Sequence, residues 1–199
     1  PCYIEAIRIR KKTLGEDHML VASSLNNLAA LYEELGQYAQ VESLYLETLE
    51  IRKKALGADH PDYAQTLINL ALFYEHTGNL DKAEAIYLQA LPIFENSYGK
   101  EHPSYASSLK NFANLYLARK QFDRAEAYYL EARSIREATV GKMHPEYATD
   151  LVNLAILYLE QKREAEAGKA LQEARTIQDS TVGVTHPEYA RTLFYLGEV

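Results

Sequence analysis

The sequence predicts an all-α solenoid of about ten helices, arranged as stacked antiparallel pairs. One observation behind this prediction is that five of the six histidines recur every 42 residues. These are His18, His60, His102, His144 and His186. A glycine stands three residues before each of them, and a proline follows all but the first. In addition, no segment alternates apolar and polar residues as a strand would. Self-similarity at a period of roughly 20 to 50 residues is typical of solenoids.

Each repeat carries the signals of two helices, here termed helix A and helix B. Proline fits the first turn of a helix because its missing N–H would have no partner there. Helix A of the second repeat is therefore expected to begin at Pro61. Gly78 marks its end. Helix B is then expected to run to about Ser97, although Pro92 should kink or shorten it.

The 42-residue period predicts one solenoid domain over residues 1–199. A partial repeat with a lone helix B is followed by four complete repeats and a partial helix A. The partial repeat covers 1–17, the complete repeats cover 18–59, 60–101, 102–143 and 144–185, and the partial helix A covers 186–199. Because the chain opens on Pro1 and stops within helix A, we expect it to be part of a longer protein.

The buried faces follow from the helical period of about 3.6 residues. In helix A of the first repeat, apolar residues follow the spacing i, i+3, i+4, i+7. They are Ala22, Leu25, Leu28, Ala29 and Tyr32. The matching stripe on helix B of the second repeat is Ala83, Ile86, Tyr87, Ala90 and Ile93. One pair cannot bury both stripes alone, so neighbouring repeats must stack.

Composition excludes several classes of function. The net charge of −7 argues against nucleic acid and anionic membrane surfaces as partners. The single cysteine, Cys2, leaves no intrachain disulfide. We find no nucleophile elbow, phosphate-binding loop or His-Glu-x-x-His motif. We therefore expect a non-catalytic, cytoplasmic protein without a cofactor.

The repeated histidines do not predict a metal site. Zinc needs three or four ligands around one ion, whereas these histidines occur once per repeat. Each stands at the start of a helix A, and His60 has an acidic neighbour in Asp59. We expect each one to cap its helix or to form a hydrogen bond in the linker.

Two motifs resemble a known family. The run Leu25-Asn-Asn-Leu-Ala-Ala-Leu-Tyr, followed by Gly36-Gln-Tyr and Glu42-Ser-Leu-Tyr, resembles the tetratricopeptide repeat (TPR). The 42-residue length and the Leu-Gly-x-x-His-Pro linker are similar to its kinesin-light-chain-like subclass, which also occurs in bacterial multidomain proteins. The resemblance covers nearly the whole chain. It implies a right-handed superhelix whose concave groove is lined by the A helices.

The face of helix A opposite the apolar stripe is the candidate binding surface. One column on it is asparagine four times: Asn27, Asn69, Asn111 and Asn153. Asparagine costs up to about 0.7 kcal/mol in a helix interior, but its amide can pair with a peptide backbone. The resemblance implies that this position contributes to peptide recognition. A hydrogen-bonded ladder between stacked A helices would explain the column equally well.

Further residues complete the predicted groove. They are Asn26, Ser23, Gln65, Ile68, Leu72, His76, Ser107, Lys110, Asn114, Thr149, Val152 and Ile156. Apolar members alternate with amides, and Glu33, Glu34 and Glu160 make part of the rim acidic. Because only Lys110 is basic on these rows, an acidic C-terminal tail is disfavoured as a ligand.

Three functions remain open at this point. The first is a protein-interaction scaffold whose groove holds an extended or short helical segment, neutral or mildly basic, with apolar anchors. The alternative is a regulatory arm of a larger enzyme, such as a bacterial caspase-like (CHAT) peptidase or a nucleotide-binding signalling protein. Its groove would hold another segment of the same parent chain. The third is self-association through the uncapped ends.

Overall fold

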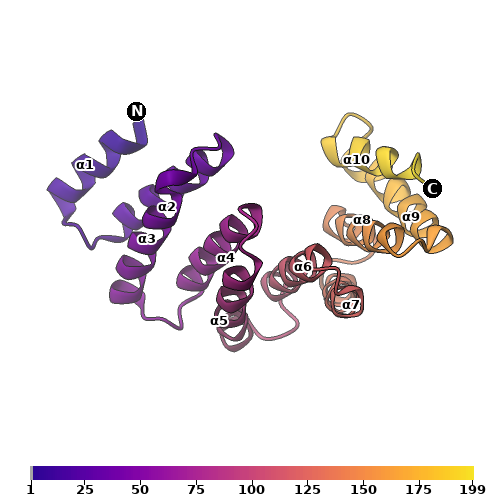
Figure 1. Cartoon of the computed structure of the whole chain (residues 1–199), viewed down its shortest axis with the longest axis horizontal. Helices are drawn as coiled ribbons and strands as arrows, with labels where there is room; N and C mark the ends of the chain where they lie inside the picture. Colours follow the sequence, from indigo (N-terminus) through magenta and orange to yellow (C-terminus); the bar gives the residue numbers. More distant parts are fainter. Residues whose placement is uncertain (1) are drawn as a thin grey trace. The chain divides into compact units, whose positions relative to one another are not determined.

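A computed structural model describes residues 2–199 (Figure 1). Within that range it contains ten α-helices, one short 3₁₀ helix and no strand, so the all-α prediction is confirmed. The chain divides into two compact units, Pro1–Ser97 and Tyr98–Val199.

The first unit contains five helices. They are α1 (Cys2–Leu14), α2 (Met19–Glu34), α3 (Val41–Leu56), α4 (Pro61–His76) and α5 (Leu80–Tyr98), with the 3₁₀ helix at Tyr38–Gln40. Here α2 and α4 are A helices, and α1, α3 and α5 are B helices. Helix α3 packs against both α2 and α4, and α1 packs against α2. The Tyr87 hydroxyl of α5 donates a hydrogen bond to Glu75 of α4 at 3.1 Å.

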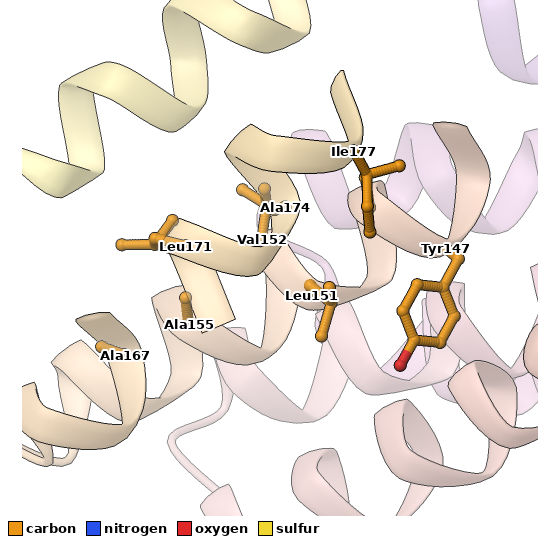
Figure 2. Packing of buried hydrophobic residues seen from close by; sticks show 9 residues of the cluster. Tyr147, Leu151, Val152, Ala155, Ala167, Leu171, Ala174 and Ile177 are labelled. Atoms are coloured by element: carbon orange, nitrogen blue, oxygen red, sulfur yellow. The ribbon is translucent and has the colours of Figure 1, made fainter. Parts of the chain in front are cut away.

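The second unit repeats the same arrangement. Its helices are α6 (Pro103–Ala118), α7 (Phe122–Thr139), α8 (Pro145–Glu160), α9 (Glu164–Thr181) and α10 (Pro187–Leu196). Consecutive helices pack in pairs, with α6, α8 and α10 as the A helices. Figure 2 shows the core between α8 and α9, where Leu151 and Ala155 of α8 lie in one buried cluster with Leu171 and Ala174 of α9. No helix among residues 2–199 is long and apolar enough to cross a membrane.

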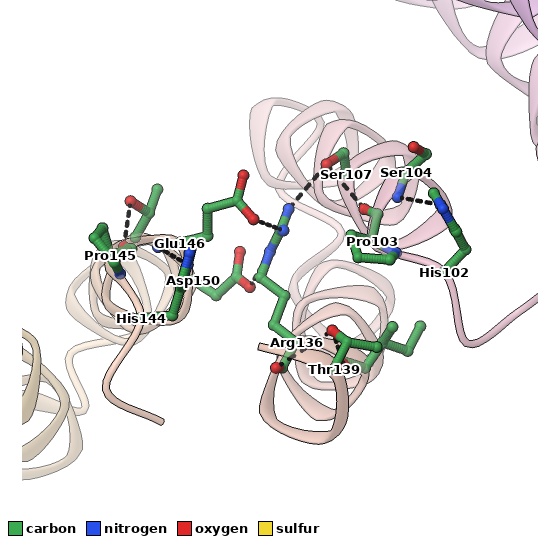
Figure 3. Close-up of polar contacts among 12 residues, drawn as sticks. His102, Pro103, Ser104, Ser107, Arg136, Thr139, His144, Pro145, Glu146 and Asp150 are labelled. Atoms are coloured by element: carbon green, nitrogen blue, oxygen red, sulfur yellow. Dashed lines mark hydrogen bonds and ion pairs between the residues drawn. The ribbon is translucent and has the colours of Figure 1, made fainter. Parts of the chain in front are cut away.

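The five periodic histidines cap the A helices. In each, the ring Nδ1 accepts the backbone N–H two residues later, at 3.1 or 3.2 Å. Figure 3 shows two of these caps, His102 with Ser104 and His144 with Glu146. A side-chain acceptor at this position satisfies a backbone N–H that the helix itself cannot pair. The predicted capping role is therefore confirmed.

The turn from helix A to helix B needs a left-handed residue. Gly36 and Gly78 supply it with φ of 68° and 77°. At the same position in the second unit, Lys120 and Lys162 adopt φ of 57° and 59°. Glycine takes this conformation without the steric cost that a Cβ atom brings, whereas the two lysines carry that cost.

Of the two effects expected of Pro92, a kink or a shortened helix B, the shortening does not occur. Helix α5 runs without a break through Pro92 to Tyr98, so the proline does not shorten it. Ala90, Ile93 and Phe94 are buried on either side of the proline. Their burial stabilises the helix on both sides of the backbone hydrogen bond that Pro92 cannot make.

A polar link recurs where helix B meets the next helix A. Arg10 of α1 donates to Ser24 Oγ of α2 at 2.5 Å, and Arg52 of α3 donates to Thr66 Oγ1 of α4 at 2.7 Å. In the second unit, Thr192 Oγ1 donates to Gln178 Oε1 at 2.7 Å. At the equivalent positions of α7 and α8, Arg136 and Asp150 form an ion pair. The corresponding residues of α5 and α6 are Phe94 and Ser108.

Candidate binding face on the A helices

In the first unit the candidate face is formed by α2 and α4. The side-chain nitrogen of Asn69 donates to Asn26 Oδ1 across the two helices at 3.0 Å, and Asn69 Oδ1 accepts from Gln65 at 3.2 Å. Asn27 is exposed and has no side-chain hydrogen bond within residues 2–199. The asparagine column therefore does form an interhelical bond here, but its partner is Asn26 rather than Asn27.

In the second unit the same column behaves differently. Asn153 of α8 is buried, and its Oδ1 accepts from Arg191 of α10 at 2.6 Å. Asn111 of α6 is half-buried, and in the described part of the chain its amide makes no hydrogen bond. Two of the four amides thus link neighbouring A helices, and two keep their hydrogen-bonding capacity for another partner.

A cavity opens between α2 and α4. Its volume is about 320 Å³, and it is lined by Ala30, Glu33, Glu34, Tyr45, Asn69, Leu72 and His76. Glu33 lies deep in it, with a side chain 15% exposed, and one of its oxygens lies 2.6 Å from His76 Nδ1. The other accepts from the Tyr45 hydroxyl at 3.4 Å. Burial, reinforced by the Glu33 charge, raises the pKa of Tyr45.

A second cavity opens between α8 and α10. Its volume is about 470 Å³, and it is lined by Ile156, Leu159, Glu160, Lys162, Glu164, Phe194, Tyr195 and Glu198. Five of these residues lie 126 positions, or three repeats, after a residue that lines the first cavity. For example, Ile156 corresponds to Ala30 and Tyr195 to Asn69. The repeat therefore builds the same opening between A helices in each unit, with different side chains around it.

A buried ionic network lies beside the face in the second unit (Figure 3). Arg136 of α7 contacts Asp150 of α8 at 2.8 Å, and both side chains are almost fully buried. Arg136 also donates to Glu146 at 2.6 Å and to Ser107 Oγ at 2.9 Å. Burial raises the pKa of Asp150 to about 6, although the positive charges of Arg136 and Lys110 oppose the rise. Burial also lowers the pKa of Lys110, against the attraction of Asp150.

Two predicted groove residues do not offer a surface. Val152 is 0% exposed within the core of Figure 2, and Ile68 at the same register is 4% exposed. The prediction that they supply apolar contact area is therefore wrong. Val152 turns toward the neighbouring helix A, where Tyr195 packs against its cluster, just as Asn26 reaches the neighbouring Asn69.

The remaining predicted residues fall into two groups. Leu72, His76 and Ile156 line the cavities. Apart from Lys110, the others already have hydrogen-bond partners. Ser23 and Thr149 donate to the carbonyl groups four residues earlier in their own helices, and Asn114 accepts from the Tyr129 hydroxyl at 2.6 Å. The hydroxyl groups on this face are thus largely used by the fold itself.

One basic residue of the face lies outside the predicted set. Arg191 of α10 stands in the same column as Ser23, four repeats later, and it bonds Asn153. It lies in the partial helix A at 186–199, beyond the four complete repeats whose columns define the predicted face. In the second unit Arg191 therefore joins Lys110 as a basic residue on the candidate face.

Comparison with known proteins gives family and structural matches. Two family models, both described as Tetratricopeptide repeat, match the chain, one at residues 62–138, 113–176 and 146–199 and the other at 21–62. No curated protein matches. BtubC (BKLC) from P. vanneervenii is a similar solved structure, with 27% identity and a TM-score of 0.80 over 98% of this chain and 78% of that one.

Two structures of a Podosopora anserina protein assigned as a kinesin light chain, with nearly identical TPR-like repeats, are also similar. Both are 27% identical and cover 90% of this chain and 85% of theirs, with TM-scores of 0.75 for a point variant and 0.72. The family models cover most of the sequence, and these neighbours carry kinesin-light-chain-like repeats. The chain therefore belongs to the tetratricopeptide repeat family.

Proposed function

We propose that this chain is a non-catalytic scaffold whose A helices bind a protein segment, extended or as a short helix. The observation that carries the proposal is the recurrence of an open cavity between consecutive A helices, at the same register in both units. TPR repeats generally bind protein or peptide partners. Each cavity combines apolar side chains with a few polar groups, which is the usual make-up of a binding site.

Two asparagines are the best placed to bind a peptide backbone. The amides of Asn27 and Asn111 make no side-chain hydrogen bond among the described residues, so each can offer a donor and an acceptor without breaking a contact. Asn69 and Asn153 would have to exchange an existing partner. Recognition through backbone hydrogen bonds leaves the cavities to select side chains.

The proposal can be tested with peptides selected on this chain from a random phage-displayed library. The double substitution Asn27→Ala and Asn111→Ala is expected to lower the affinity for these peptides about tenfold, because each hydrogen bond contributes a net of about 0.5–1.5 kcal/mol. Asn96→Ala is the matched control, because Asn96 is exposed on helix α5, away from the face. Its peptide affinity should stay unchanged, and neither variant should have a lower melting temperature than the wild type, because alanine is the better helix former. Equal peptide affinity of the double variant and the control would refute the proposal.

The regulatory-arm alternative uses the same face with a segment of the parent chain as its occupant. Reading the coding sequence on either side of residues 1–199 distinguishes the two. A caspase-like peptidase or nucleotide-binding domain encoded there would favour the regulatory arm.

A further inference from the structure

The two cavities between A helices differ most in the residues at their inner ends. In the first, Glu33 of α2 lies where the second has Leu159 of α8. Tyr45 of α3 lies beneath the first cavity, and the residue three repeats later is the fully buried Leu171. The first cavity thus has a carboxylate and a phenol in its depth, while the second has aliphatic side chains at these two positions.

The carboxylate of Glu33 is shielded from water. Its side chain is only 15% exposed, whereas the acidic residues around the second cavity, such as Glu160, are exposed. A charge in such a setting interacts more strongly with an opposite charge than one in open solvent does. Its present partners are the Tyr45 hydroxyl and His76, whose side chain is 58% exposed.

Further acidic groups surround this position. Glu34 also lines the cavity, and no ion pair to its carboxylate exists within residues 2–199. Glu75 lies close enough that its charge and that of Glu33 together raise the pKa of Tyr87, after the larger effect of burial. Neither Lys nor Arg is among the residues that line the cavity. The exposed His76 is thus the one basic side chain among the lining residues.

The rest of the lining suits a long basic side chain. Ala30 and Leu72 provide apolar walls against which the methylene stem of Lys or Arg can pack while its charged end reaches a carboxylate. A volume of about 320 Å³ is at the small end for ligand sites, so it fits one side chain rather than a cofactor. A guanidinium can bond a carboxylate through two parallel N–H groups.

We infer that the cavity between α2 and α4 is a subsite for a cationic side chain of the bound segment, which displaces His76 from Glu33. Glu33 binds the charged end from within the cavity, Glu34 assists at its mouth, and Leu72 packs against the stem. The inference rests on the proposed function, because it names a side chain that the scaffold selects.

The test is an NMR titration of the whole chain with Nα-acetyl-arginine amide and with its neutral isostere, Nα-acetyl-citrulline amide, read from the His76 and Tyr45 rings. The arginine probe should bind at least tenfold more tightly than the citrulline probe. Glu33→Gln should remove most of this preference, and Glu34→Gln should reduce it by a smaller factor. Glu160→Gln, the same change at the equivalent position of the second cavity, should leave it intact.

His76→Ala provides the sharpest test. If His76 competes with the probe for Glu33, this variant should bind the arginine probe severalfold more tightly. The Tyr45 ring signals measure the affinity. Equal affinity for arginine and citrulline, or weaker arginine binding by His76→Ala, would overturn the inference. Peptide binding that still depends on Asn27 and Asn111 would then show that the scaffold function survives and only the subsite is wrong. If the cavity selects arginine but peptide binding does not depend on Asn27 and Asn111, the subsite is right and the proposed role of the asparagines is wrong.

Discussion

At the residue scale, the capping histidines make a measurable contribution to stability. His18 is exposed, and its Nδ1 accepts from the Leu20 N–H at 3.1 Å. Replacing it with alanine leaves that N–H without a side-chain acceptor. We expect His18→Ala to lower the free energy of unfolding by about 1 kcal/mol in urea denaturation. His18→Asn keeps an acceptor and should remain near the wild type. An alanine variant as stable as the wild type would contradict the capping role.

The raised pKa of Asp150 predicts how the stability of the fold changes with pH. Its pKa is raised to about 6 in the folded protein, from an ordinary value of 3.8. Between these values the folded state binds more protons than the unfolded state, so the contribution of Asp150 to stability improves as the pH falls through this window. The groups around it are Arg136, Lys110 and Glu146.

Asp150→Asn removes this titration while keeping the side-chain shape. The difference in unfolding free energy, wild type minus variant, should therefore rise as the pH is lowered from 7.5 to 4.5. Urea denaturation at several pH values measures it. A difference that is flat or falls on acidification would show that the pKa of Asp150 is not raised.

At the element scale, the polar link between helix B and the next helix A should stabilise the stack. Arg52 donates to Thr66 Oγ1 at 2.7 Å and to the Asp62 carbonyl. We expect Arg52→Met to cost about 1–3 kcal/mol, because hydrogen bonds from charged groups contribute about that much. Thr66→Ser keeps the acceptor and serves as the control. A double-mutant cycle of Arg52→Met with Thr66→Val measures the coupling between the two side chains, and a coupling near zero would refute the link.

Helix boundaries could be predicted from sequence because their signals are local. Proline after histidine starts an A helix, and Pro61 does begin α4. The left-handed lysines could not be predicted, because nothing local to Lys120 or Lys162 favours φ near 60°. Likewise, the continuity of α5 through Pro92 depends on side chains buried against other elements.

The candidate site could be predicted only in part. The period fixes which residues share a face, and Leu72 and His76 of the predicted face do line a cavity. A step of one residue along the helix, from Asn27 to Asn26, decides whether a side chain faces outward or toward the neighbouring helix A. Val152 was misplaced for this reason. The depth of Glu33 depends on the distance between two helices, which a periodic pattern does not contain.

At the scale of the whole molecule, the repeats should be removable in units of 42 residues. Deleting residues 60–101 would join α3 to α6 and place Arg52 beside Ser108, the chemistry that Arg10 and Ser24 already use. Because each repeat of a solenoid depends mainly on its neighbours, the shortened chain should unfold cooperatively with unchanged helicity per residue by circular dichroism.

Deleting residues 102–143 is the matched comparison. It would place Phe94 beside Asp150 and remove Arg136, leaving a buried carboxylate without its partner. Loss of one partner of a buried ion pair costs about 3–5 kcal/mol. This chain should therefore be less stable than the first deletion by several kcal/mol. Equal stability of the two deletions would show that the residues at the junction do not matter.

The capping hydrogen bonds also make the histidine rings natural NMR probes of the repeats. Because Nδ1 accepts a backbone N–H in five histidines, each of them must carry its proton on Nε2. His76 instead presents Nδ1 to a carboxylate. Nitrogen-15 chemical shifts of the rings distinguish these tautomers, so every repeat contains one natural probe at the start of its helix A. Local opening of a single repeat could thus be followed without any label beyond isotopes.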